Sequence, residues 1–187
     1  MDIKYNEALK YYDSKNYDKA FKLFEELAHS GNLNAQMAVA TMLEEGDKIK
    51  RNLKQAYYWY EKAALQNDVE ALHIYALYCL KKGEKNKGYT MLNQATGLNY
   101  VPAINSLANI YDYGDFGYEV NKKKAIELYK KACLLNDSQS CKNLYSLLRE
   151  LESKEDVYQY IKEEIGFFKF FKIIILGRIK NWFSNFF

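Results

Sequence analysis

The chain has 187 residues, of which 49% are hydrophobic and 27% charged, with a net charge of +3, nine glycines and one proline. So little glycine and proline excludes a collagen-like or linker-type chain and disfavours a sheet protein with many tight turns, whereas the abundant Ala, Leu, Lys and Glu favour helices. The first twenty residues carry charges throughout and contain no apolar core, so they do not read as a secretory signal. The expected location is therefore cytoplasmic.

An internal repeat organises most of the chain. Four segments of thirteen residues align without gaps, each opening on a small residue and then carrying apolar residues at the second, fourth and fifth places. This spacing puts one apolar stripe on a helix with a polar opposite face. The closing Asn or Asp suits a helix end and the turn after it. The segments are AFKLFEELAHSGN from Ala20, AYYWYEKAALQND from Ala56, GYTMLNQATGLNY from Gly88 and AIELYKKACLLND from Ala125.

A second type of helix alternates with the first, beginning at Ala35, Ala71, Ala103 and Ser140. Small residues recur at its first and sixth places, where we expect helices to cross closely. Larger residues should fill the space between helices, and glycines should end them because glycine adopts positive φ at little cost. The small residues are Ala35 and Ala40, Ala71 and Ala76, and Ala103 and Ala108; the larger ones are Val39, Tyr75, Leu107 and Leu144; the glycines are Gly46, Gly83 and Gly114.

These residues carry a family resemblance. The segment from Tyr5 to Leu27 resembles a tetratricopeptide (TPR) unit, with Ala8, Tyr11, Tyr17 and Ala20 at signature places, and departs from the pattern at Glu7. The second and fourth units resemble Sel-like repeats (SLR), whose two helices are linked by a glycine, an apolar residue, an Asn or Asp and a Lys-Ala or similar pair. The matching residues are Gly46, Ile49, Asn52 and Gln55-Ala56, and then Gly114, Val120, Asn121 and Lys124-Ala125. The third unit has a short TPR-type link over 83–88.

The resemblance implies an all-α fold, a right-handed α-solenoid of TPR/SLR hairpins. We expect a repeat array over 1–151, with about four hairpins and the first helix of a fifth. A capping helix should follow over 152–164 and a hydrophobic basic tail over 165–187. Small bacterial SLR proteins serve as adaptors in signalling, secretion, host interaction or toxin–immunity pairs, which implies a non-catalytic scaffold for a protein partner.

The residues themselves give no sign of catalysis or of a cofactor. The two histidines, His29 and His73, belong to no zinc, nucleophile or phosphate-binding motif. The three cysteines, Cys79, Cys133 and Cys141, are odd in number and contain no CxxC pair, which argues against a disulfide framework and a zinc site. Cys133 and Cys141 could approach each other across a helical turn pair, but buried free thiols are far commoner, so we expect all three to be small buried hydrophobes. The repeat region has no basic stripe, so we expect no nucleic-acid partner despite its many tyrosines.

In this family the first helix of each hairpin lines the concave side. We therefore predict that the residues at its third, seventh, and tenth to eleventh places contact the partner, although apolar members of this set can instead pack on adjacent repeats. The set is Met37, Thr41, Glu44, Glu45, His73, Leu77, Leu80, Lys81, Asn105, Asn109, Asp112 and Tyr113.

The last 23 residues differ from the rest. From Ile165 onward there are four cations, no acidic residue and most of the phenylalanines, whereas tyrosine stops at Tyr160. The cations disfavour a membrane span, and the aromatic face fits an amphipathic helix at a membrane surface. Four alternatives remain open: a spanning anchor, a cap on the last repeat, contact with a partner, and a dimer seal. The predicted contact residues are Phe168, Lys169, Phe171, Lys172, Ile175, Arg178, Ile179, Lys180, Trp182, Phe183 and Phe186.

The leading hypothesis is thus an adaptor that holds a protein partner on its concave face, with the tail meeting the partner or the inner face of the membrane. One alternative is an immunity-type inhibitor that blocks one cognate toxin. The other is a membrane-active protein whose tail is the effector.

Overall fold

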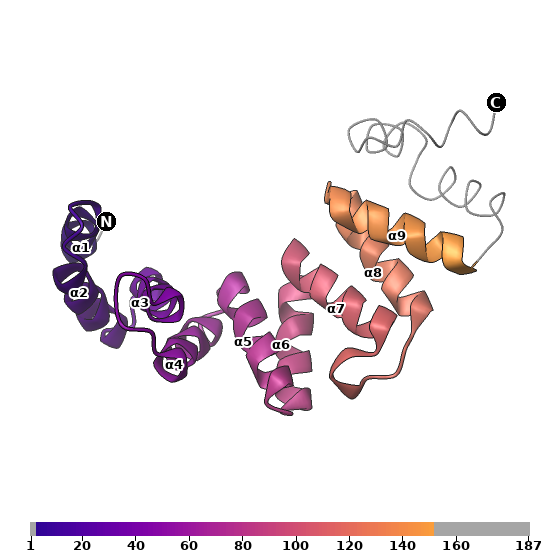
Figure 1. Cartoon of the computed structure of the whole chain (residues 1–187), viewed down its shortest axis with the longest axis horizontal. Coiled ribbons are helices and arrows are strands. Elements are labelled where there is room, and N and C mark those ends of the chain that lie inside the picture. The colour runs from indigo at the N-terminus through magenta and orange to yellow at the C-terminus, as the bar shows by residue number, and fades with distance from the viewer. Residues whose placement is uncertain (1–2, 152–187) are drawn as a thin grey trace. The chain divides into compact units, whose positions relative to one another are not determined.

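The structure, a computed structural model, describes residues 3–151, and all regular secondary structure in that range is helical (Figure 1). Backbone contacts divide the chain into two compact units, Met1–Leu98 and Asn99–Phe187, which are described separately here. The first holds α1 (Ile3–Asp13), α2 (Tyr17–His29), α3 (Leu33–Glu45), α4 (Leu53–Ala64), α5 (Val69–Lys81) and α6 (Lys85–Gly97). The second holds α7 (Val101–Tyr113), the short 3₁₀ helix η1 (Asp115–Gly117), α8 (Lys122–Leu134) and α9 (Ser138–Leu151).

Successive helices pack as hairpins. In the first unit α1 packs on α2, α3 on α4 and α5 on α6, and the hairpins join through α2 with α3 and α4 with α5. In the second unit α7 packs on α8, and α8 on α9. Each helix therefore buries one stripe against its sequence neighbours, as its apolar periodicity predicts. The predicted capping helix over 152–164 lies outside the described residues.

The small residues lie at the tightest positions. The six alanines expected at helix crossings are completely buried, and the four larger residues expected between helices are buried as well. An alanine methyl allows two helix backbones to approach closely while still excluding water. This part of the packing is confirmed, including the helix ends at Gly46 and Gly114, both of which have positive φ.

The turns between hairpins use the same two positions each time. Gly31, Asn67, Asn99 and Asn136 occupy the twelfth place of the four aligned segments, and all have positive φ, which glycine and asparagine adopt most readily. The thirteenth residue then caps the next helix: Asn32, Asp68 and Asp137 accept hydrogen bonds from the backbone N–H of Ala35, Ala71 and Ser140. In the third segment Tyr100 stands there without a side-chain cap, and Pro102 lies in the first turn of α7 instead.

One glycine is required for steric reasons. Gly88 opens the third aligned segment, where the other repeats have alanine. A Cβ at this position would lie 2.7 Å from Cγ of Leu80 and 2.8 Å from the carbonyl oxygen of Ala76. Leu80 therefore fills the volume that an alanine methyl fills in the other hairpins.

The cysteine expectation is wrong for two of the three residues. Cys133 of α8 and Cys141 of α9 form a disulfide, with their Cα atoms 4.7 Å apart. The odd number of cysteines and the lack of a CxxC pair favoured free thiols over an approach of Cys133 to Cys141. The tight turn between α8 and α9 nevertheless places these two positions opposite each other. Cys79 is a free, buried thiol, as expected.

Candidate functional site

The residues predicted to contact a partner lie on α3, α5 and α7, and we call the positions on α3 and α5, within the first unit, the first-helix face. On α3, Met37 and Glu44 are half-buried, whereas Thr41 and Glu45 are exposed. On α5, His73 and Leu77 are half-buried and Lys81 is exposed. On α7, Asn105 and Asn109 are half-buried and Tyr113 is exposed. These ten side chains are at least partly accessible. The α7 residues belong to the second unit and are considered apart from the others.

Two members of the set must be corrected. Leu80 is 3% exposed and Asp112 is 6% exposed, so neither can contact a partner. Both stand at the tenth place of their helix, which faces the second helix of the same hairpin. Leu80 packs against Gly88 of α6, and Asp112 bonds to Lys122 and Tyr129 of α8. The helical periodicity was correct, but the predicted accessible stripe extended one position too far around the helix and so included two buried residues.

A groove of about 360 Å³ opens on the first-helix face in the first unit. Its floor contains Phe24 of α2 and Met42 of α3, both buried. Its remaining lining comes from three helices: Tyr5, Leu9 and Tyr12 of α1, Asn34, Met37, Ala38, Thr41 and Glu45 of α3, and Glu70 of α5. Three predicted residues, Met37, Thr41 and Glu45, thus lie together in one concave site.

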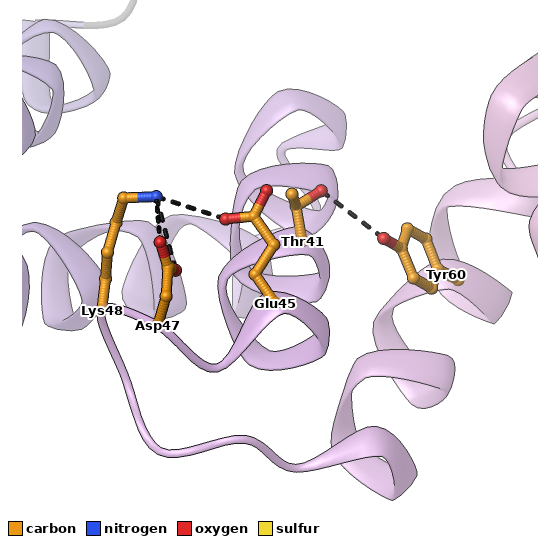
Figure 2. Close-up of polar contacts among 5 residues, drawn as sticks. All are labelled: Thr41, Glu45, Asp47, Lys48 and Tyr60. Atoms are coloured by element: carbon orange, nitrogen blue, oxygen red, sulfur yellow. Dashed lines mark hydrogen bonds and ion pairs between the residues drawn. The ribbon is translucent and has the colours of Figure 1, made fainter.

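A loop lysine contacts two residues of the groove lining, Tyr12 and Glu45. Figure 2 shows Lys48 reaching from the α3–α4 link to two carboxylates, Asp47 at 3.1 Å and Glu45 at 3.3 Å. Its Nζ also lies 5.6 Å from the centre of the Tyr12 ring, close enough for a cation–π contact. Hydrogen bonds to Tyr12, Asp47 and Glu45 raise the pKa of Lys48, so it remains a cation at all ordinary pH values.

Behind the groove, Tyr60 of α4 joins the polar residues of α3. Its hydroxyl donates to Oε2 of Glu44 over 2.7 Å and lies 3.5 Å from the Thr41 hydroxyl, a contact visible in Figure 2. Burial, more than the neighbouring Glu44, raises the pKa of the Tyr60 phenol, so it stays protonated and continues to donate. Glu44 and Thr41 are thereby held in fixed positions at the edge of the face.

On α5 the accessible side chains are less polar. Leu77 and His73 stand one helical turn apart and are half-buried. Burial lowers the pKa of His73, which favours the neutral imidazole near neutral pH. The tyrosines nearby pack on one another: the rings of Tyr57 and Tyr78 stack at 3.8 Å between α4 and α5. These tyrosines are structural contacts and not a free stacking platform.

In the second unit the polar residues of α7 bond to neighbouring helices. Asn105 donates to Asp137 over 3.1 Å and also contacts the Ser140 hydroxyl, while Asn109 accepts from Tyr129 over 2.6 Å. Only Tyr113, 69% exposed, projects without such a role. These α7 positions are therefore more a packing surface than a free binding surface.

Residues 3–151 contain neither a metal-ligand cluster nor a membrane-spanning helix. Between residues 3 and 151 no group of three or more His, Cys, Asp or Glu is placed to hold a metal ion. Within the same range no helix is both long and apolar enough to span a bilayer. The predicted tail residues, from Phe168 to Phe186, lie outside the described residues.

Sequence reasoning missed the part of the groove contributed by α1 and by Glu70. The signal was present, because Tyr5, Leu9 and Tyr12 follow the spacing of one helical face. It was not used because only helices resembling the segment at Ala35 were counted as lining the concave side. Glu70 precedes the aligned positions of α5 and could be placed at the groove only from the tertiary structure.

The Sel1 repeat profile matches residues 10–32, 33–68 and 101–137, together just over half of the chain. These segments contain both long-link hairpins, α3–α4 and α7–α8. The α5–α6 hairpin, whose link is short, is not matched.

Three known proteins are similar to this chain. Chitin synthase regulatory factor 3 of Schizosaccharomyces pombe is 30% identical over 129 residues, which are 64% of this chain but 14% of that protein, so the chain spans only a small part of its length. The solved structure of c5321, a protective antigen of uropathogenic Escherichia coli with an SLR fold, superposes with a TM-score of 0.69 at 21% identity, covering 85% of this chain and 34% of that one. A Sel1 repeat protein of Oxalobacter formigenes gives 0.65 at 20% identity, covering 84% of this chain and 65% of its own. These two likenesses show the fold, an α-solenoid of repeats.

Proposed function

Because this chain belongs to the Sel1 repeat family, we propose that it is a non-catalytic scaffold that holds a protein partner on its first-helix face. Sel1 repeat proteins generally mediate protein–protein interactions, and stacked repeats suit this role because they present one extended face built from many helices. The curated relative is named as a regulatory factor, a role that a scaffold of this kind can fill.

The observation that carries the proposal is the groove between α1 and α3. It combines a buried apolar floor with accessible polar residues at its edge, the arrangement typical of protein-binding surfaces. Thr41 and Glu45 are held there by Tyr60 and Lys48 respectively. A partner therefore meets side chains that have already lost much of their freedom, which lowers the entropy cost of binding.

The partner-binding face is tested by capture experiments with the full chain. Thr41→Arg and Lys81→Glu change exposed positions of the face on α3 and α5, and Lys22→Glu changes an exposed position of α2 as the matched control. We expect one partner to be retained by the wild type and by Lys22→Glu, and to be lost from the two face variants. A partner retained equally by all four proteins would place binding elsewhere.

We propose residues 165–187 as a second contact, with the membrane surface. The support is in the sequence: Lys169, Lys172, Arg178 and Lys180 occur with aromatic residues and without any acidic residue. Such segments are attracted to anionic lipids, each cation contributing about 1 kcal/mol near the surface.

The full chain should sediment with vesicles of phosphatidylglycerol and phosphatidylcholine but not with phosphatidylcholine alone. Glutamate at all four positions should abolish the difference, and an unchanged distribution would contradict the proposal.

A further inference from the structure

The groove between α1 and α3 has an uneven lining that restricts what can occupy it. Its floor is apolar, with Tyr5 packed against Phe24 at 5.4 Å between ring centres. On its α1 side Leu9 is 39% exposed, so its side chain is accessible to a ligand. An apolar side chain that covers these surfaces excludes water from them, which lowers the free energy of the complex.

The charged residues of the lining are all acidic. They are Glu45 at the end of α3 and Glu70 in the first turn of α5. Lys48 pairs with Glu45, but it also pairs with Asp47, so one cation serves two carboxylates. Glu70 forms no ion pair within residues 3–151, and its side chain is exposed. The groove therefore presents an acidic edge beside an apolar floor.

The complementary ligand has the opposite distribution of charge. A lysine or arginine next to an apolar side chain can place its cation at Glu70 while the apolar group enters the groove. An acidic segment would be repelled, as would a phosphate backbone.

We propose that this groove binds an amphipathic, basic segment of the partner protein. A side chain of leucine or phenylalanine size would contact Leu9 and Met37, and a lysine or arginine would lie beside Glu70. This inference rests on the proposed function and adds to it the chemistry of the ligand. The mode of recognition is an apolar anchor in a groove with charges setting the orientation.

The methionines provide a direct readout. The chain has four methionines, of which Met37 and Met42 line the groove, whereas Met91 lies on α6 and does not. The full chain, labelled with ¹³C at the methionine methyl groups, is titrated with two synthetic alanine-based peptides of roughly 16 residues, long enough to hold a helix. Both carry Phe and Leu one turn apart; one is flanked by two lysines and its twin by two glutamates.

We expect the lysine peptide to shift the methyl signals of Met37 and Met42 and to leave Met91 unchanged. The glutamate peptide should bind about fivefold more weakly, the difference expected of exposed charge pairs. Glu70→Lys should reverse this preference, whereas Glu26→Lys, at an exposed position of α2 away from the groove, should not change it. Reversal by the charge swap would separate a specific contact at Glu70 from general electrostatic attraction to the protein.

Several results would overturn the proposal. Equal binding of the two peptides, or shifts that spare Met37 and Met42, would remove the groove as a basic-segment site. Signals of Met37 that move on dilution without peptide would make a second copy the occupant. In a Trp59→Phe background Trp182 is the remaining tryptophan, so a change in its emission on Glu70→Lys would make the chain's own tail the occupant. A partner that is lost with Thr41→Arg but bound normally by Glu70→Lys would contradict this inference and leave the proposed function intact.

Discussion

The α3–α4 and α7–α8 hairpins are two copies of one repeat that use the same polar position differently. Tyr60 and Tyr129 occupy equivalent places, and each hydroxyl meets the residues at the seventh and tenth places of the preceding helix. In α3–α4 these are Thr41 and Glu44; in α7–α8 they are Asn109 and Asp112. Asp112 is buried and Glu44 only half-buried.

A single position accounts for much of this difference. The first helical residue after the capping asparagine is Lys122 in α8 and Leu53 in α4. Lys122 binds Asp112 over 2.8 Å, so that carboxylate becomes part of the packing. Glu44 has no such partner in α4 and stays at the edge of the accessible face. The same repeat thus produces an internal ion pair in one hairpin and an accessible carboxylate in the other.

The α5–α6 hairpin has apolar residues at these positions. Leu77, Leu80 and Leu92 stand at the places that are polar in the other two hairpins, and Leu80 and Leu92 are buried. Polar groups at these places are therefore not needed for the hairpin to form. Their presence in α3–α4 and α7–α8 adds hydrogen bonds to a packing arrangement that leucine alone can sustain.

Among substitutions that distinguish the two units, loss of the disulfide should have the largest effect on the free energy of unfolding. Within the described residues only the second unit contains a disulfide. Breaking the Cys133–Cys141 bond should lower the free energy of unfolding by about 2.5 kcal/mol, the chain-entropy value for so short a loop. Urea denaturation with and without a thiol reductant measures this. The Cys133→Ala/Cys141→Ala variant should be insensitive to reductant, and a wild type equally insensitive would contradict the bond.

Removing the cation that distinguishes α8 from α4 should have the next largest effect. Lys122→Leu leaves the buried Asp112 carboxylate without its ion pair and should lower the free energy of unfolding by about 2 kcal/mol. Lys123→Leu, at an exposed neighbouring position, should change it by less than about 0.5 kcal/mol. Equal effects of the two substitutions would show that the ion pair does not stabilise the hairpin.

The two tyrosines should differ when their hydroxyls are removed. Tyr129→Phe leaves an oxygen of buried Asp112 without a donor and should cost about 1.5 kcal/mol, whereas Tyr60→Phe should cost about 0.5 kcal/mol because water can reach the half-buried Glu44. Urea denaturation of the two variants under the same conditions gives the difference. A larger loss for Tyr60→Phe would reverse our view of which hairpin depends on its polar contacts.

The smallest effect should come from transferring the cation to the first unit. Leu53→Lys puts an ammonium group at the equivalent of Lys122, where it can pair with Glu44, and should add about 0.5 kcal/mol of stability. Little packing is lost, since Leu53 is 38% exposed. In a Glu44→Gln background the gain should disappear, and a gain that persists there would have another source.

The aligned repeats predicted the helices well because their signals are local. The stripe that makes each helix amphipathic, the buried alanines at crossings and the glycines after α3 and α7 all follow from spacing within one segment. Each twelfth residue with positive φ is a glycine or an asparagine for the same local reason. The likeness to known repeat proteins added the solenoid arrangement to these local features.

The candidate site was only partly predictable because it depends on which residues meet across helices. Met37, Thr41 and Glu45 were assigned correctly to accessible positions, but Leu80 and Asp112 were placed one step beyond the accessible stripe. The contribution of Tyr5 and Leu9 appears only when α1 and α3 are seen to enclose one groove. Periodicity gives the direction of a side chain around its own helix and not the distance to the next one.

The sequence by itself determined the number, type and ends of the helices within residues 3–151, because capping, propensity and apolar spacing act over a few residues. Only the tertiary structure decided that Cys133 meets Cys141, that Asp112 is neutralised by Lys122, and that an acidic edge stands beside an apolar floor near Phe24. These contacts join residues on different helices. Their formation depends on how the helices pack, which no single repeat specifies.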